Sequence, residues 1–200
     1  MKNFKFCLSR IRILFVFSKG EPDDRFLNYD SGIRCQATKE IFNMPNSQLM
    51  KIYFIGGKPE KEKDIPVSVQ MKIYFDSLTS QAEISEALFK SNNAFGNVRE
   101  VLDIVKEKKI NTISILANKY QLPRFIKMFK NQGIVSLRIF PVEAEQVLIL
   151  SDCRAEEMKA YLKSSKYKLR TLLEKLLIIW LFFDPEYKII TKWRKFRRSR

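Results

Sequence analysis

Residues 91–124, SNNAFGNVREVLDIVKEKKINTISILANKYQLPR, decide the fold. Apolar side chains in the first half recur at the i, i+3, i+4, i+7 spacing of an amphipathic helix. They are Val98, Val101, Leu102 and Val105. Asn93 is a good N-cap for this helix, because its side-chain oxygen can accept a backbone N–H of the first turn. Residues 113–117, ISILA, form a short apolar run that is typical of a strand buried on both faces of a parallel sheet.

The same alternation of short apolar runs and helical stripes extends outward in both directions. Strands are expected at residues 11–18, 51–55, 84–89, 113–117 and 134–140, with Pro141 ending the last one. A helical stripe lies between each pair of strands. This order predicts an α/β fold of three layers, α/β/α, doubly wound around a mostly parallel five-stranded sheet with right-handed crossovers. We place this domain at residues 1–150, C-terminal helices that pack on it at 151–184, and a basic tail at 185–200.

Composition excludes several classes of site. The chain has no histidine, so Ser-His-Asp and Cys-His triads and histidine metal ligands are absent. Its three cysteines are far apart and form no CxxC, which argues against a zinc site or a disulfide framework. The formal net charge is +15. Residues 159–200 hold thirteen Lys or Arg against three acids, 13 − 3 = +10, so the excess is concentrated at the C-terminus.

The apolar runs are short for a membrane span. Residues 176–183, LLIIWLFF, are apolar over eight positions, whereas roughly twenty are needed to cross a bilayer. The N-terminal run is interrupted by Arg10 and Arg12 and does not read as a secretory signal. We therefore expect a cytoplasmic protein, with peripheral attachment to a membrane as the alternative.

Small or polar residues follow the predicted strands or open the helices after them, at the sheet edge where parallel α/β folds bind ligands. Helix N-termini there offer N–H groups to an anion, and two arginines could add guanidinium contacts. The candidate ligand-binding residues are Gly20, Arg34, Gly56, Gly57, Ser91, Asn93, Asn97, Asn118 and Arg124. Taken singly, a glycine could be only a turn residue, Asn93 only a cap and Arg124 only a solvated surface residue. No phosphate-loop or dinucleotide fingerprint is present.

Four short motifs carry a resemblance to a known family. They are Arg34, Ile55-Gly56-Gly57, residues 91–97 (SNNAFGN) and residues 117–124 (ANKYQLPR). In this arrangement, residues 11–183 resemble the YdcF/SanA/ElyC family of bacterial domains, and residues 167–192 resemble the C-terminal helix of its SanA-like branch. The resemblance implies a role in the cell envelope. It also implies a small ligand, with S-adenosylmethionine as a candidate cofactor because one member is reported to bind it.

The departures from the family pattern fall on its proton-transferring groups. The family Thr and Glu correspond to Ala94 and Gly96, and the acid opening the second helix corresponds to Val67. The His corresponds to Gln121, and the Thr of the same motif to Ala117. The resemblance therefore implies a degenerate member that lacks general acid–base groups, so we expect no catalytic residue. Loop residues that could substitute for them are Asp23, Asp24 and Arg25.

The pattern of the C-terminal region predicts two helices, at residues 156–162 and 166–183. The second has apolar side chains on almost every side. Such a helix must be covered, by the body of the domain, by a second copy or by a membrane surface. Beyond it, basic and aromatic residues alternate in a tail that fits an anionic bilayer, nucleic acid or simple solvation. The tail residues are Lys192, Trp193, Arg194, Lys195, Phe196, Arg197 and Arg198.

Two functional hypotheses follow from these patterns. In the first, the strand-end crevice binds a small anionic or nucleoside-type ligand without catalysis. In the second, the protein is an interaction protein whose basic tail binds an anionic membrane surface or nucleic acid. No metal site is expected in either, and the sequence leaves the oligomeric state open.

Overall fold

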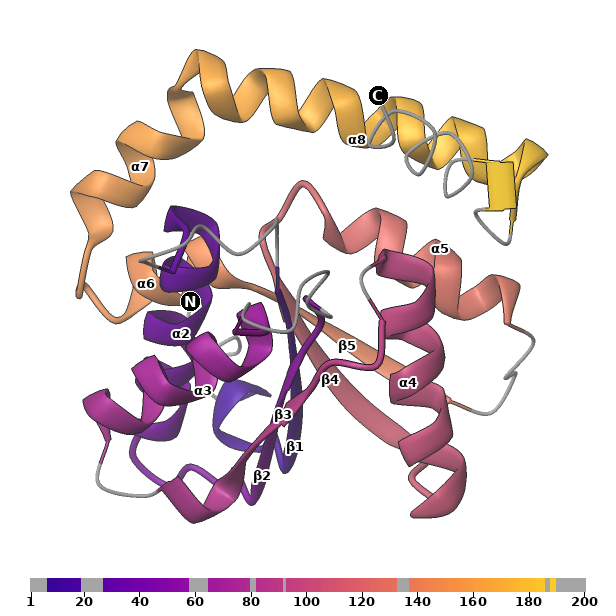
Figure 1. Ribbon diagram of the computed structural model, residues 1–200. Coiled ribbons are helices and arrows are strands. Elements are labelled where there is room, and N and C mark those ends of the chain that lie inside the picture. Colours follow the sequence, from indigo (N-terminus) through magenta and orange to yellow (C-terminus); the bar gives the residue numbers. More distant parts are fainter. Residues whose placement is uncertain are drawn as a thin grey trace.

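The protein folds around one parallel sheet of five strands in the order β3-β2-β1-β4-β5 (Figure 1). The computed structural model describes residues 7–18, 27–57, 65–79, 82–91, 93–132, 137–185 and 188–189. The strands are β1 (Ile13–Phe17), β2 (Lys51–Ile55), β3 (Ser85–Leu88), β4 (Thr112–Ala117) and β5 (Arg138–Glu143). The predicted three-layer α/β fold with C-terminal helices is confirmed.

Helices cover both faces of this sheet and continue beyond it. They are α2 (Tyr29–Phe42), α3 (Val67–Leu78), α4 (Ala94–Glu107), α5 (Leu122–Asn131), α6 (Ala144–Leu150), α7 (Ala155–Lys163) and α8 (Ser165–Phe183), with a 3-10 turn η1 (Ala82–Ile84) before β3. The turn from β5 into α6 was not expected from the sequence, because the short apolar run of α6 has no capping or glycine signal around it.

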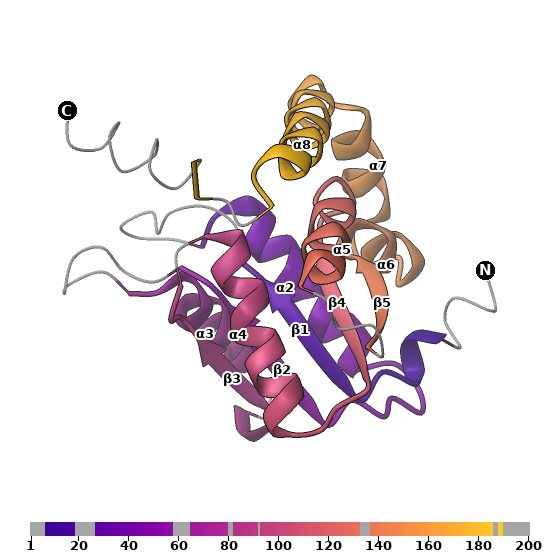
Figure 2. The ribbon, with the colours of Figure 1, turned by 90° about the vertical axis from the view of Figure 1, so that its right-hand side faces the viewer.

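Strand alternation divides the core into two layers. Phe15 and Phe17 of β1 pack against α4 and α5, whereas Leu14 and Val16 pack on the other face against α2, α3 and α6. All four side chains are fully buried. In Figure 2 the sheet is seen face-on, with α4 and α5 in front of it and α2 and α6 behind it.

The expected end of the last strand was wrong. Pro141 does not stop β5 but lies inside it, paired opposite Ile115 of β4. The strand is at the edge of the sheet, where one row of N–H groups needs no partner strand, so a proline is tolerated. The strand therefore begins and ends later than the sequence pattern indicates.

Helices α7 and α8 connect the two layers across the end of the sheet. Tyr161 of α7 and Tyr167 of α8 are buried with the α2/α3/α6 layer, whereas Leu181 near the end of α8 is buried with the α4/α5 layer. In Figure 1 the two helices form an arch over the β4–α5 turn. Within the described residues, we find no helix with the length and apolarity that a membrane crossing requires.

Candidate functional site

The strand order changes direction between β1 and β4, and Arg34 of α2 fills the carboxyl edge at this point. Its side chain is completely buried. The guanidinium donates to the backbone carbonyl oxygen of Phe17 at the end of β1 and to the side-chain oxygens of Asn118 and Gln121 after β4. The Nε–Oδ1 distance to Asn118 is 2.8 Å. Each of its three nitrogens thus already has a partner inside the protein.

The positive charge of Arg34 is balanced indirectly, by the Glu145 carboxylate acting through Asn118. The Asn118 amide that accepts from Arg34 donates to Glu145 Oε1 at 2.8 Å, and the backbone N–H of Lys119 donates to the other carboxylate oxygen at 3.0 Å. Burial raises the pKa of Glu145, and the hydrogen bond from Asn118 opposes that shift. Glu145 lies in the first turn of α6 and is 1% exposed. The chain Arg34–Asn118–Glu145 therefore joins α2, β4 and α6 as one buried polar unit.

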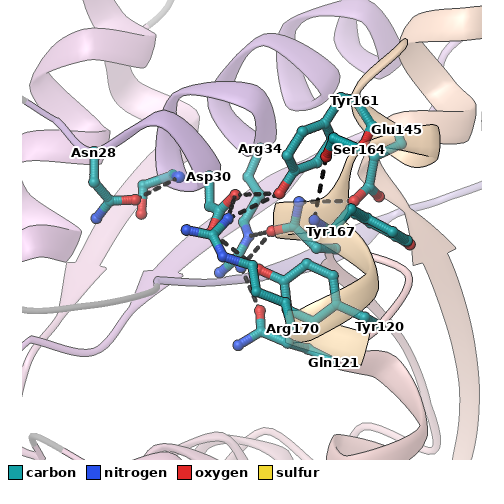
Figure 3. A network of polar contacts seen from close by, with 12 residues as sticks. Asn28, Asp30, Arg34, Tyr120, Gln121, Glu145, Tyr161, Ser164, Tyr167 and Arg170 are labelled. Carbon is teal, nitrogen blue, oxygen red and sulfur yellow. Dashed lines mark hydrogen bonds and ion pairs between the residues drawn. The ribbon is translucent and has the colours of Figure 1, made fainter. Parts of the chain in front are cut away.

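A second polar cluster, centred on Asp30, attaches the C-terminal arch to this edge (Figure 3). The buried carboxylate of Asp30 accepts hydrogen bonds from the hydroxyls of Tyr120 and Tyr161, at 2.9 and 2.8 Å. Arg170 of α8 completes it with an ion pair at 2.6 Å. The hydrogen bond to Asp30 and burial both hold the pKa of the Tyr161 hydroxyl above its ordinary value, with burial the larger cause.

Arg124 was expected to reach a ligand, but it contacts α8. Its guanidinium lies 2.8 Å from Glu174, and both side chains are about nine-tenths buried. Two ion pairs, from α2 and from α5, therefore hold α8 over the β1/β4 half of the edge. A ligand could reach Arg34 or Arg124 only if these internal contacts were broken.

The β2/β3 half of the same edge is built around a double-glycine turn. Gly56 and Gly57 have φ of 109° and 80°, values that other residues rarely adopt. A Cβ at Gly56 would lie 2.5 Å from the Ser18 hydroxyl oxygen and 2.6 Å from the Asn97 amide. A Cβ at Gly57 would lie 2.7 Å from the backbone nitrogen of Val67, the first residue of α3. Only glycine lets the backbone of this turn approach the starts of α3 and α4 so closely.

The start of α4 completes this half. Asn93 caps the helix as expected, accepting the N–H of Gly96 at 2.7 Å. A Cβ on Gly96 would overlap the Ser91 side chain. With its amide nitrogen facing the acceptors, Asn97 donates to the carbonyl oxygens of Ser91 and Asn93, both at 3.2 Å. Glycine at position 96 is thus required by the packing of Ser91.

Two buried polar groups, one near the start of α3 and one in α4, have an oxygen without a hydrogen-bond partner among the described residues. The Ser68 hydroxyl is one; its own backbone N–H donates to Gly56 at 3.2 Å. Glu100 is the other: Oε1 accepts the backbone N–H of Lys90 just after β3, whereas Oε2 has no such partner. Burial is the main cause that raises the pKa of Glu100. Buried polar groups are normally paired, so these two oxygens require an explanation.

The sequence-derived site residues therefore separate into groups. Gly56, Gly57, Ser91, Asn93 and Asn97 come together at the carboxyl ends of β2 and β3. Arg34 and Asn118 come together at the ends of β1 and β4, and Arg124 lies against α8. Gly20, the loop residues Asp23, Asp24 and Arg25, and tail residues 192–198 lie outside the described residues. Sequence reasoning did not find Ser68, Glu100 or Glu145.

The described residues contain no group of three or more His, Cys, Asp or Glu side chains that could hold a metal ion. No protein-family model matches the sequence. Searches of the curated proteins and of the solved structures also found no match.

Proposed function

We propose that this protein binds a small nucleoside-type ligand with an anionic group at the carboxyl ends of β2 and β3. The observation that carries the proposal is a pair of buried oxygens on the two helices that start at this edge, Ser68 Oγ of α3 and Glu100 Oε2 of α4, which lack hydrogen-bond partners among the described residues. A ligand that hydrogen-bonds these oxygens would remove the cost of leaving them unsatisfied, which is about 1–3 kcal/mol for each group.

The chemistry around the turn supports a ligand with two kinds of group. The first turns of α3 and α4 present backbone N–H groups and the positive end of the helix dipole, which favour a phosphate or carboxylate. Helix α3 has no side-chain hydrogen bond at its N-cap, Pro66, whereas Asn93 caps α4. The anionic group is therefore assigned to the start of α3. The Glu100 carboxylate suits hydroxyl or amino donors, as on a ribose or a base.

Binding without catalysis is the reading that these residues favour. Burial raises the pKa of Glu100 above its ordinary value, and a raised carboxyl pKa is one property of a general acid. However, the other groups assigned to the ligand are hydroxyls, an amide and backbone N–H groups, which do not transfer protons near neutral pH. Gln121, at the position of the family histidine, serves Arg34 as an acceptor.

The resemblance to the YdcF/SanA/ElyC family supports the same edge of the sheet as the place of binding. Its further implications, a role in the cell envelope and S-adenosylmethionine as ligand, stay predictions. So do the cytoplasmic location and the binding of nucleic acid by the basic tail.

Thermal unfolding with a panel of ligands tests the proposal. The panel contains S-adenosylmethionine, adenosine monophosphate, inorganic phosphate and a polyprenyl phosphate. A ligand at a hundred times its dissociation constant adds about 2.7 kcal/mol to the free energy of unfolding, a shift in Tm of roughly 5–10 °C.

Matched variants locate the binding. Ser68→Ala and Glu100→Gln should each reduce the ligand-induced shift, whereas Ser77→Ala and Glu107→Gln, exposed controls on the same two helices, should retain it. A shift that survives both site variants would contradict the proposal, as would a panel in which no ligand changes Tm.

A further inference from the structure

Helix α8 carries its apolar side chains on the face that points away from the protein. Large apolar residues with 42% to 76% of their surface exposed recur along one side of it. These residues, called here the outer face of α8, are Leu169, Leu172, Leu173, Leu176, Ile179, Trp180 and Phe183. The sequence predicted that this stripe would be covered, and the body of the protein does not cover it.

The opposite side of α8 explains why the helix faces this way. Arg170 pairs with Asp30 of α2, and Glu174 pairs with Arg124 of α5. Tyr167 and Leu181 are buried against the body at the two ends of the helix. Turning the outer face inward would break both ion pairs and leave their charges buried without partners. The exposure of the apolar face is therefore fixed by the way in which α8 is attached.

The charges that border the outer face distinguish a membrane surface from a second copy of the protein as its partner. The exposed charged side chains of α8 are lysines, Lys166, Lys168 and Lys175, whereas the acid of the helix, Glu174, is buried in its ion pair. By helical periodicity Lys168 and Lys175 border the outer face on one side and Lys166 borders it on the other. A second copy docked face to face would bring lysine against lysine, and α8 has no exposed acid to balance them. Anionic headgroups would neutralise the same lysines.

We propose that α8 lies in the interface of an anionic lipid bilayer, with its outer face among the upper acyl chains and its lysines at the headgroups. A helix with leucine, tryptophan and phenylalanine on one side and lysines beside them is the pattern of an interfacial helix. Lysine stems can lie along the apolar surface while the ammonium groups reach the phosphates. Since α8 passes over the β4–α5 turn, docking brings the carboxyl edge of the sheet toward the membrane (Figure 1).

Co-sedimentation of the full-length protein with lipid vesicles tests the proposal. Vesicles of phosphatidylcholine mixed with phosphatidylglycerol should bind the protein at low salt, and vesicles of phosphatidylcholine alone should bind it much less. Lys168→Gln should weaken binding about fivefold, because one lysine near an anionic surface contributes about that factor. Lys106→Gln, an exposed lysine on α4, should leave binding unchanged.

The apolar contribution is tested by Leu173→Glu with Leu176→Glu. This double variant should bind anionic vesicles at least about tenfold more weakly, because two inserted leucines are lost. Met50→Glu with Ile73→Glu, which changes two apolar residues elsewhere that are at least as exposed, is the matched control. Circular dichroism should show that both variants remain folded, since every changed side chain is exposed.

Tryptophan fluorescence tests whether α8 enters the bilayer, without a contribution from Trp193 of the basic tail. In Trp193→Phe, Trp180 is the one tryptophan left of two. Its emission should shift to the blue when anionic vesicles are added. The proposal would be overturned if the Leu173→Glu/Leu176→Glu double variant bound vesicles as well as the wild type, or if vesicles left the Trp180 emission unchanged. It would also be overturned if the wild type were a stable dimer that does not bind vesicles and that the same double variant dissociates.

Discussion

The two halves of the carboxyl edge of the sheet use polar residues in opposite ways. At the ends of β1 and β4, hydrogen bonds join Arg34 to Asn118 and Asn118 to Glu145, and α8 lies across this network. At the ends of β2 and β3, the glycine turn is followed by Ser68 and Glu100, each with an oxygen that has no partner among the described residues. Both halves hold buried polar groups, but among the residues that the structure describes only the first half pairs all of them.

A polar residue at a sheet edge is therefore not by itself a ligand-binding residue. A complete network contributes to folding, and its loss exposes the full desolvation cost of each member. An incomplete one costs folding free energy until something binds. We therefore assign stability to the β1/β4 half and ligand binding to the β2/β3 half. Substitutions in each half should separate the two roles.

The largest effect is expected from Arg34→Met, which removes the centre of the complete half. It leaves the oxygens of Phe17, Asn118 and Gln121 buried without their donor, so we expect the free energy of unfolding to fall by about 3–5 kcal/mol. Urea denaturation measures it. Arg99→Met, an exposed arginine of α4, should cost less than about 0.5 kcal/mol. Equal losses in the two variants would contradict the structural role of Arg34.

A smaller loss is expected from Arg170→Met, which removes the ion pair between α8 and Asp30. We expect about 1.5–3 kcal/mol, the value of a hydrogen bond to a charged group. Hydrogen exchange should show the loss first in residues 165–183, because this contact holds α8 on the body. Lys168→Met, exposed on the same helix, should leave exchange unchanged. Protection that stays the same in Arg170→Met would show that other contacts hold α8.

Gly57→Ala should destabilise the incomplete half by about 1–3 kcal/mol, because alanine is strained at this positive φ and its Cβ would meet the start of α3. Gly32→Ala is the matched control: its Cβ would meet no atom within 4 Å, and it lies within α2. There alanine should stabilise by roughly 0.5–1 kcal/mol. Thermal unfolding reads both values, and a neutral Gly57→Ala would argue against the turn geometry.

The smallest effect is a pH dependence from Glu100. Its pKa in the folded protein is raised by burial, so the folded state binds the proton more tightly than the unfolded state. The stability of the wild type should therefore fall as pH rises through the window above the ordinary carboxyl value. Glu100→Gln lacks this loss, so its stability relative to the wild type should increase as the pH rises through that window. A difference in stability between Glu100→Gln and the wild type that does not change with pH would contradict the burial of Glu100.

The fold was readable from the sequence because it depends on periodicity. Buried strands such as residues 51–55 are apolar runs, and Asn93 caps α4 by a purely local hydrogen bond. Pro141 misled the strand prediction because its tolerance depends on β5 being an edge strand, which is a property of the whole sheet. Local rules predicted the five strands and the helices between them, but they missed α6 and placed both ends of β5 too early.

The site was less readable, because burial of polar groups depends on contacts far apart in the chain. Glu100 lies off the apolar stripe of α4, so periodicity places it in solvent, yet the end of β3 buries it. Arg124 reads as an exposed arginine after a proline until Glu174, fifty positions later, packs against it. The outer face of α8 reads as core because a pattern does not tell which side of a helix the body takes.

An NMR titration of the labelled protein with S-adenosylmethionine and, separately, adenosine monophosphate tests the division of the edge most directly. We expect at least one of them to shift the backbone amide signals of Gly56, Gly57, Ser68 and Ser91, and to leave those of Asn118 and Gln121 in place. Shifts concentrated on Asn118 and Gln121 would mean that the Arg34 network opens to bind. That result, or no shift around the glycine turn with either compound, would contradict the assignment of binding to the β2/β3 half.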